Sequence, residues 1–226
     1  MDEKKIKVEN YNNLENLNFI NSNSIVLDIG ANIGNVSEFI FNKYNCNIFS
    51  YEPNIACYNY MKKRFAYNKK IRIYNYAISN FSGEGSLYFH RFSKGNNDER
   101  YIEGATLRSD KDNIDINKNI KVKIVNIKEI LNEHKYIDLI KIDIEGAEYQ
   151  IMPELIKNKH LIKMVICELH GDPEGKKIGN EPKNKKFMNE YDELVKKLKN
   201  NNLYNNKFYQ PLLNRYWQVL NSKLFN

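Results

Sequence analysis

The chain has 226 residues, of which 42% are hydrophobic and 28% are charged, and its net charge is +7. This length and composition exclude a disordered tail protein and a fibrous repeat, and allow a core that needs no disulfides or metals. No run approaches the roughly 18 apolar residues of a membrane span. The N-terminus lacks the apolar core of a secretory signal.

Cysteine and lysine usage narrow the class further. Cys46, Cys57 and Cys167 form no Cys-x-x-Cys pair, so neither a disulfide framework nor a zinc site is indicated. Reduced, buried thiols are typical of a reducing compartment, and we expect a cytoplasmic protein. The lysines are scattered among asparagines rather than clustered with aromatic residues, which argues against a nucleic-acid partner.

The first part of the chain alternates strand and helix patterns. Apolar runs and helical spacing predict a strand at 24–29, a helix at 35–44, a strand at 46–51, a helix at 53–67 and a strand at 71–76. Proline is well placed in a first helical turn, so we expect Pro53 to open the second helix.

The second part resumes this alternation after an irregular region. We expect a strand at 85–90 and a loop over the polar, glycine-dotted segment 94–119. The elements predicted beyond it are strands at 122–126, 137–142, 164–169, 203–208 and 216–220, with helices at 128–133, from 147, and at 187–200.

This order predicts an α/β fold: a mostly parallel sheet with helices on both faces and an antiparallel C-terminal edge. We expect one domain over 1–226, with an N-terminal extension at 1–22 and an inserted region at 85–126 as a candidate substrate lid. Ligands of such sheets bind outside the carboxyl ends of the strands. The candidate site residues at those ends are Asp28, Gly30, Glu52, Asn75, Asp143 and His170.

A glycine-containing segment, Asp28-Ile29-Gly30-Ala31-Asn32-Ile33-Gly34, follows the first predicted strand. Asp28 and Ile33 stand where a dinucleotide-binding fingerprint has its first and third glycines. A carboxylate at Asp28 repels a pyrophosphate but suits a cationic or hydroxyl-bearing ligand. Glu52, about 20 residues further on, has the usual position for binding ribose hydroxyls. Together these features indicate a positively charged nucleoside such as S-adenosylmethionine.

Three motifs resemble the FkbM family of S-adenosylmethionine-dependent methyltransferases. They are Asp28–Gly34, Tyr51-Glu52-Pro53-Asn54, and the Lys-x-Asp-x-Glu-Gly-Ala-Glu pattern within 140–148. The last is the most specific, and the order and spacing of all three strengthen the resemblance. Gly104-Ala105-Thr106-Leu107 is similar to a small-residue motif of the family's inserted loop. The resemblance runs from about residue 24 to residue 170.

The resemblance implies a class I methyltransferase (Rossmann-like) fold, S-adenosyl-L-methionine as cofactor and methyl transfer to a hydroxyl oxygen. It implies that Asp28, Gly30 and Asn32 hold the methionine end, that Glu52 binds the ribose, and that Asn75 and Ala77 lie near the adenine. The cofactor-binding set is then Asp28, Gly30, Ala31, Asn32, Gly34, Glu52, Pro53, Asn75, Ala77 and Asp143. Asp143 and Glu145 face the donor and acceptor in this reading.

His170 ends the run Glu168-Leu169-His170 at the same edge of the sheet. Because an imidazole titrates near neutral pH, we expect His170 to be the general base that removes the hydroxyl proton. Asp143 or Glu145 could instead orient the imidazole or take the proton. Asp143, Glu145 and Asp172 also offer oxygen ligands for magnesium, but nothing in their spacing demands a metal, and we assign none.

The acceptor is expected to be a hydroxyl-bearing small molecule or a glycan, bound by residues 91–120 and the C-terminal part of the chain. Polar and stacking contacts could come from Glu99, Arg100, Tyr101, Arg108, Tyr216 and Trp217. The sequence does not indicate the oligomeric state.

Two other functions stay open. Lys141, Asp143, Lys163 and Glu168 could form the Lys-Asp-Lys-Glu set of an RNA 2′-O-methyltransferase, although alternation along a strand explains the first pair equally well. A non-catalytic nucleotide-binding protein that keeps the fold is the other alternative. The intact acidic residues at the strand ends argue against it.

Overall fold

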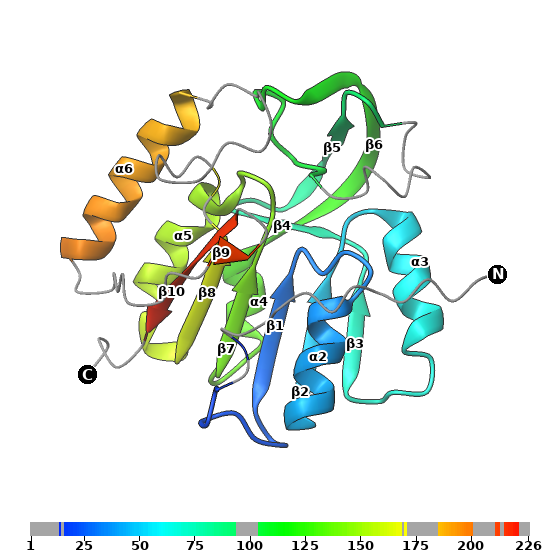
Figure 1. The fold of residues 1–226 in the computed structure, drawn as a ribbon, viewed down its shortest axis with the longest axis vertical. Helices are drawn as coiled ribbons and strands as arrows, with labels where there is room; N and C mark the ends of the chain where they lie inside the picture. The colour runs from blue at the N-terminus through cyan, green and yellow to red at the C-terminus, as the bar shows by residue number, and fades with distance from the viewer. Residues whose placement is uncertain are drawn as a thin grey trace.

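The structure is a computed structural model in which a larger and a smaller β-sheet are accompanied by helices (Figure 1). It describes residues 14, 16–93, 104–168, 170, 185–200, 211–212 and 215–221. The strand predicted at 203–208 lies outside these residues, as do Glu99, Arg100, Tyr101 and Asp172. Tyr216 and Trp217 are described only as part of a strand.

The main sheet has seven strands in the order β3-β2-β1-β7-β8-β10-β9. Five neighbouring strands run parallel: β1 (Ile25–Ile29), β2 (Asn47–Tyr51), β3 (Ile71–Tyr74), β7 (Leu139–Ile142) and β8 (Met164–Glu168). β10 (Arg215–Asn221) pairs antiparallel with β8, and β9 (Pro211–Leu212) pairs antiparallel with β10. The predicted parallel sheet with an antiparallel C-terminal edge is therefore confirmed.

Helices cover both faces of this sheet because its strands bury apolar side chains on both sides. Val26 packs in a core that includes residues of α2 (Asn35–Tyr44) and α3 (Ile55–Arg64). The next residue, Leu27, packs in a second core with residues of α4 (Ile127–Asn132), α5 (Glu148–Lys157) and α6 (Lys185–Asn200). Successive side chains of a strand point to opposite faces, so one apolar strand supplies both cores.

The prediction that Pro53 opens the second helix is wrong. Asn54 is the N-cap residue: its side-chain oxygen accepts a hydrogen bond from the backbone N–H of Ala56 at 3.0 Å. The helix begins at Ile55 and ends at Arg64, so it is shorter than predicted. Asparagine is a preferred N-cap because it satisfies an N–H that the first turn leaves without a partner, and here it moves the start two residues past the proline.

The inserted region forms a second, three-stranded sheet in the order β4-β6-β5. Its strands are β4 (Ala77–Ser79), β5 (Gly83–His90) and β6 (Ile114–Asn126). The prediction of a loop as far as residue 119 is wrong, because 114–119 pair with the end of β5. Figure 1 shows β5 and β6 at the end of the molecule toward which β1 runs. This places the insertion over the carboxyl ends of the main strands.

No helix among the described residues is long and apolar enough to cross a membrane.

Candidate functional site

The polar residues predicted from the strand ends converge at the carboxyl edge of the main sheet. The first loop, which follows β1, runs between the ends of β2 and β7. The Gly30 and Ala31 N–H groups both donate to the Tyr51 carbonyl, at 3.0 and 3.1 Å, and the Asp143 N–H donates to the Ile29 carbonyl at 3.0 Å. These backbone bonds bring Gly30, Glu52 and Asp143 together.

Two glycines in the first loop have conformations that other residues rarely adopt. Gly30 has φ +79°, and a Cβ there would lie 1.9 Å from the carbonyl oxygen of Asp143. Gly34 has φ +85°, and a Cβ would lie 2.6 Å from the ring of Phe65. Both positions need glycine for conformation and for space. The loop can therefore approach the β7 end closely.

Asp28 lies inside β1 and is fully buried. Its carboxylate accepts a hydrogen bond from the Ser37 hydroxyl at 2.6 Å and pairs with Lys141 Nζ at 3.2 Å. Lys141 also donates to the Gly30 carbonyl at 2.8 Å. Burial alone would lower the pKa of Lys141, but the Asp28 and Asp143 carboxylates outweigh burial and raise it. Lys141 is thus charged and ties the first loop to the sheet beneath it.

Glu52 lies just beyond β2 and is 7% exposed. Its two carboxylate oxygens accept hydrogen bonds from the N–H groups of Asn32 and Asn54, both at 2.8 Å. Burial raises the pKa of Glu52 to about 7, against the lowering effect of these two bonds and of Lys141. A carboxylate carries about four acceptor sites, so Glu52 can accept further hydrogen bonds from hydroxyl groups.

The residues predicted to lie near an adenine have structural contacts here. The Asn75 side-chain amide donates to the carbonyls of Glu52 and Pro53, at 2.9 and 3.0 Å, and so fixes the backbone that follows β2. Ala77 lies in β4 and is 4% exposed, within the small core of the second sheet. Their contacts with an adenine stay predictions.

The loop after β7 is held by its own glutamate. Glu148 is fully buried, and its two oxygens accept hydrogen bonds from the N–H groups of Ile144 and Gly146, at 3.1 and 2.9 Å. These bonds support a turn in which Glu145 has φ +56° and Gly146 has φ +103°. The turn presents the Glu145 side chain at the strand edge.

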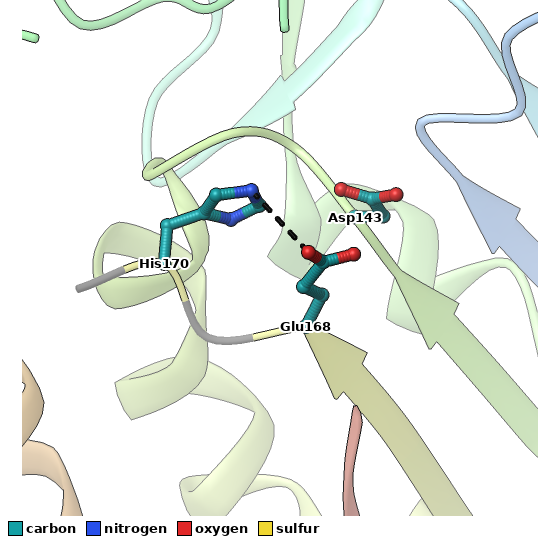
Figure 2. Close-up of side chains that lie close together, drawn as sticks. All are labelled: Asp143, Glu168 and His170. Carbon is teal, nitrogen blue, oxygen red and sulfur yellow. Dashed lines mark ion pairs between the residues drawn. The ribbon is translucent and has the colours of Figure 1, made fainter. Parts of the chain in front are cut away.

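His170 lies between the carboxylates of this loop. Its Nδ1 is 3.0 Å from Glu148 Oε1, and its Nε2 is 3.0 Å from Glu145 Oε2 and 3.8 Å from Glu168 Oε1. Burial alone would lower the pKa of His170, but Glu145 and Glu148 outweigh it and raise the pKa well above the usual range. Figure 2 shows the imidazole facing Glu168, with Asp143 beside them.

Two cationic side chains of the inserted region contact the loop after β7, and the sequence motifs do not indicate these contacts. Lys111 forms an ion pair with Glu145, and Arg108 donates to the Gly146 carbonyl at 3.3 Å. Arg108 is 6% exposed and is also paired with Asp110 and, from α6, Glu190. The expectation that Arg108 contacts the acceptor stays a prediction. In the structure its guanidinium group binds Asp110, Glu190 and the Gly146 carbonyl.

A cavity of about 460 Å³ lies beside the same loop. Its lining combines the inserted segment with α5 and α6, and includes Leu107, Arg108, Asp110, Tyr149, Gln150 and Glu190. The Tyr149 hydroxyl donates to the backbone carbonyl of His170, which connects the cavity wall to the strand edge. Carboxylate, amide and hydroxyl groups in this lining suit a ligand rich in hydroxyls.

A model of the methyltransferase FkbM domain matches residues 28–205. The chain belongs to the FkbM methyltransferase family. The family inferred from three short motifs is therefore confirmed. A search of curated proteins finds no match for the chain.

Solved methyltransferase structures are similar to this FkbM-family chain at low identity. A Staphylococcus aureus protein assigned as a caffeoyl-CoA O-methyltransferase is 16% identical with a TM-score of 0.50, over 88% of this chain and 76% of that one. A precorrin-6y C5,15-methyltransferase from Geobacter metallireducens GS-15 is 12% identical with a TM-score of 0.46, over 91% and 82%. The METTL16 methyltransferase domain is 13% identical with a TM-score of 0.46, over 94% and 63%. At 16% identity the likeness to the Staphylococcus aureus protein concerns the fold alone, and it is the predicted class I methyltransferase fold.

One of the four residues of the RNA-methyltransferase alternative, Lys163, lies away from the other three in this FkbM-family fold. Lys163 precedes β8, whereas Glu168 ends that strand and Asp143 follows the parallel strand β7. Lys163 and Glu168 therefore lie at opposite ends of β8, roughly 15 Å apart along the strand. The Lys163 ammonium instead lies 4.7 Å from the ring centroid of Phe19.

Proposed function

We propose that this protein catalyses S-adenosylmethionine-dependent methylation of a hydroxyl oxygen on a sugar, glycan or small metabolite. The observation that carries the proposal is the contact between Glu145 and His170 beside Asp143, at the same strand edge as Glu52 and the first loop. Membership of a methyltransferase family supports the reaction type. The polar cavity beside the loop supports a hydroxyl-rich acceptor.

The first loop and Glu52 fit the cofactor. Glu52 keeps acceptor sites for ribose hydroxyls, and the glycine at position 30 lets the first loop lie against the Asp143 carbonyl at the end of β7. In this proposal Asp28 acts from beneath, through Lys141, by fixing the Gly30 carbonyl. Gly30, Ala31, Asn32 and Gly34 shape the loop, and Asn75 and Pro53 support Glu52 from the neighbouring backbone.

Methyl transfer is an in-line displacement. S-adenosylmethionine supplies the methyl group as a sulfonium, whose carbon–sulfur bond breaks as the acceptor oxygen bonds to the carbon. The protein has to hold the acceptor oxygen about 3–3.5 Å from that carbon and opposite the sulfur. The hydroxyl proton leaves as the new bond forms, which requires a nearby acceptor for it.

We assign the Glu145 carboxylate as the acceptor of the hydroxyl proton, and His170 as the residue that positions this carboxylate. Glu145 is a partly exposed carboxylate, unlike the fully buried Glu148, and it lies 3.0 Å from His170 Nε2. The opposite assignment, with His170 as the general base, stays a prediction. The geometry favours Glu145 because both imidazole nitrogens already face carboxylates.

Product analysis tests this assignment. Purified protein is incubated with S-adenosylmethionine and a panel of sugars and glycans, and mass spectrometry follows the gain of one methylene unit. We expect an O-methylated sugar product from the wild type and none from Glu145→Gln, with cofactor affinity unchanged in the variant. Glu84→Gln, at an exposed position on β5, is the matched control. Full turnover in Glu145→Gln would overturn the assignment, and methylation only of nitrogen-containing acceptors would overturn the proposed acceptor class.

A further inference from the structure

Asp143, Glu168 and His170 form a mixed cluster of oxygen and nitrogen donors (Figure 2). One atom from each side chain, a carboxylate oxygen or an imidazole nitrogen, lies within 4.8 Å of the other two. Asp143 follows β7 and Glu168 ends β8, and these strands are parallel neighbours. The sheet itself therefore sets the spacing of the two carboxylates.

The imidazole of this cluster is oriented from its far side. Glu148, which is fully buried, lies 3.0 Å from Nδ1 and is fixed by two backbone N–H groups of the loop. Nε2 is thereby directed toward Glu168 and Glu145. A histidine that binds a metal usually donates its other ring N–H to a carboxylate in this way, which fixes its tautomer and its direction.

We propose that Asp143, Glu168 and Nε2 of His170 bind a divalent cation that takes mixed oxygen and nitrogen ligands, for which Mn²⁺ is the appropriate probe. Carboxylate oxygens favour Mg²⁺ and Mn²⁺, and the single imidazole favours Mn²⁺ over Mg²⁺. The cation would lie between Nε2 and the carboxylates. Three protein ligands leave coordination positions open for water or for an acceptor hydroxyl.

The ligands of this site differ from the set that the sequence offers. The sequence set combines Asp143 with Glu145 and Asp172 and does not by its spacing demand a metal. Among the residues that the structure describes, Glu168 and His170 share a point with Asp143. A cation on Nε2 would replace the contact of that nitrogen with Glu145, whereas the ion pair with Lys111 would continue to hold the Glu145 carboxylate beside the cation as the proton acceptor.

The role of the cation rests on the proposed function. A hydroxyl bound to a divalent cation loses its proton more readily, because the metal stabilises the alkoxide. The proton passes to Glu145, the alkoxide oxygen bonds to the methyl carbon, and the carbon–sulfur electron pair returns to sulfur. No oxidant or reductant is needed, so a redox-inert metal serves as well as a redox-active one.

Titration of the full chain with Mn²⁺ tests the site directly, with the signal of free Mn²⁺ followed by electron paramagnetic resonance. We expect one strongly bound ion per chain, and a dissociation constant that rises at least about tenfold in Asp143→Asn and in Glu168→Gln, since loss of a direct ligand costs no less than loss of a group that orients one. Glu84→Gln should bind like the wild type. No binding by the wild type at millimolar Mn²⁺, or equal binding by both site variants and the control, would overturn the proposal.

A second readout identifies the nitrogen ligand. In pulsed measurements, Mn²⁺ bound to the wild type should show magnetic coupling to a ¹⁴N nucleus, and His170→Gln should lack it. Absence of this coupling in the wild type would overturn the proposal even if a variant failed to fold. Calorimetry with S-adenosylmethionine in the presence of a chelator separates the two claims. Mn²⁺ binding without cofactor binding would refute the proposed function alone, and cofactor binding without Mn²⁺ binding would refute the metal site alone.

Discussion

Two loops face each other across the carboxyl edge of the sheet, and they keep their shapes by different means. The loop after β1 is set by its backbone, through glycines at positions 30 and 34 and through N–H bonds to the Tyr51 carbonyl. The loop after β7 is set by charged side chains from three segments, with Glu145 and Glu148 contacting Lys111 and His170. Backbone constraints are insensitive to pH and salt, whereas an ion-pair network responds to both. We therefore expect the loop after β1 to keep its shape as pH and salt change, and the shape of the loop after β7 to respond to both.

The largest expected effect comes from Lys141, which pairs with Asp28 in β1 and donates to the Gly30 carbonyl in the first loop. In Lys141→Met the buried Asp28 carboxylate would lose its counter-charge and the Gly30 carbonyl its donor. Removing one partner of a buried ion pair costs about 3–5 kcal/mol. Urea unfolding should show this loss, and Asp28→Asn combined with Lys141→Met should recover part of it. A single variant as stable as the wild type would show that the pair does not support the loop.

Gly30→Ala should have the next largest effect. The new methyl would overlap the Asp143 carbonyl oxygen, so the two loops could not keep their contact. We expect a loss of about 2–4 kcal/mol in the free energy of unfolding, from crowding and from a positive φ. Gly104→Ala is the matched control, because its φ is +83° and nothing lies within 4 Å of the added carbon. Equal losses in the two variants would mean that conformation alone, and not the contact between the loops, matters.

Glu52 makes the cofactor side sensitive to pH in one respect. Its pKa is raised from 4.5 to about 7, so below pH 7 the carboxyl of the free protein is protonated and must lose a proton to accept ribose hydroxyls. Cofactor affinity should therefore rise about tenfold between pH 6 and pH 8. Glu52→Gln should bind weakly at both pH values, without this rise. A wild-type affinity that does not change with pH would contradict the assignment.

The same shift predicts the opposite trend for the unliganded protein. A folded-state pKa above the unfolded value contributes stability that is fully present at low pH and is lost as the pH rises through about 7. The melting temperature of the wild type should fall relative to that of Glu52→Gln between about pH 4.5 and pH 7, because the glutamine does not ionise.

The smallest expected effect is that of Lys111, which connects the inserted region to Glu145. Lys111→Gln should lower turnover about fivefold, which corresponds to the roughly 1 kcal/mol of an ion pair near the surface, and should leave cofactor affinity unchanged. Lys121→Gln, an exposed lysine on the same second sheet, is the control. A parallel loss of cofactor affinity would mean that the two loops do not act separately.

The difference between the loops also explains what the sequence could predict. The first loop and Glu52 lie within short motifs, so their positions at the strand ends follow from local pattern alone. The parallel sheet follows from the alternation of strands and helices. The start of α3 at Ile55 depends on which residue caps it, and the strand at 114–119 depends on pairing with β5, which no local pattern records.

The acceptor side is harder to predict because its contacts are distant in the chain. The ion pair of Lys111 with Glu145 joins segments 34 residues apart, and Arg108 reaches Glu190 across 82 residues. His170 was singled out by its place at a strand end, but its two carboxylate partners appear only once the loop after β7 is folded. For Glu148, its place at the end of the Lys-x-Asp-x-Glu-Gly-Ala-Glu motif is the one feature of the sequence that indicates a role at this site.

Calorimetric titration with S-adenosylmethionine and S-adenosylhomocysteine, with NAD as the control, tests the central claim most directly. The account predicts micromolar binding of the adenosyl ligands at pH 8, weaker binding at pH 6 and no binding of NAD. Binding of NAD, or no binding of either adenosyl ligand at both pH values, would contradict it.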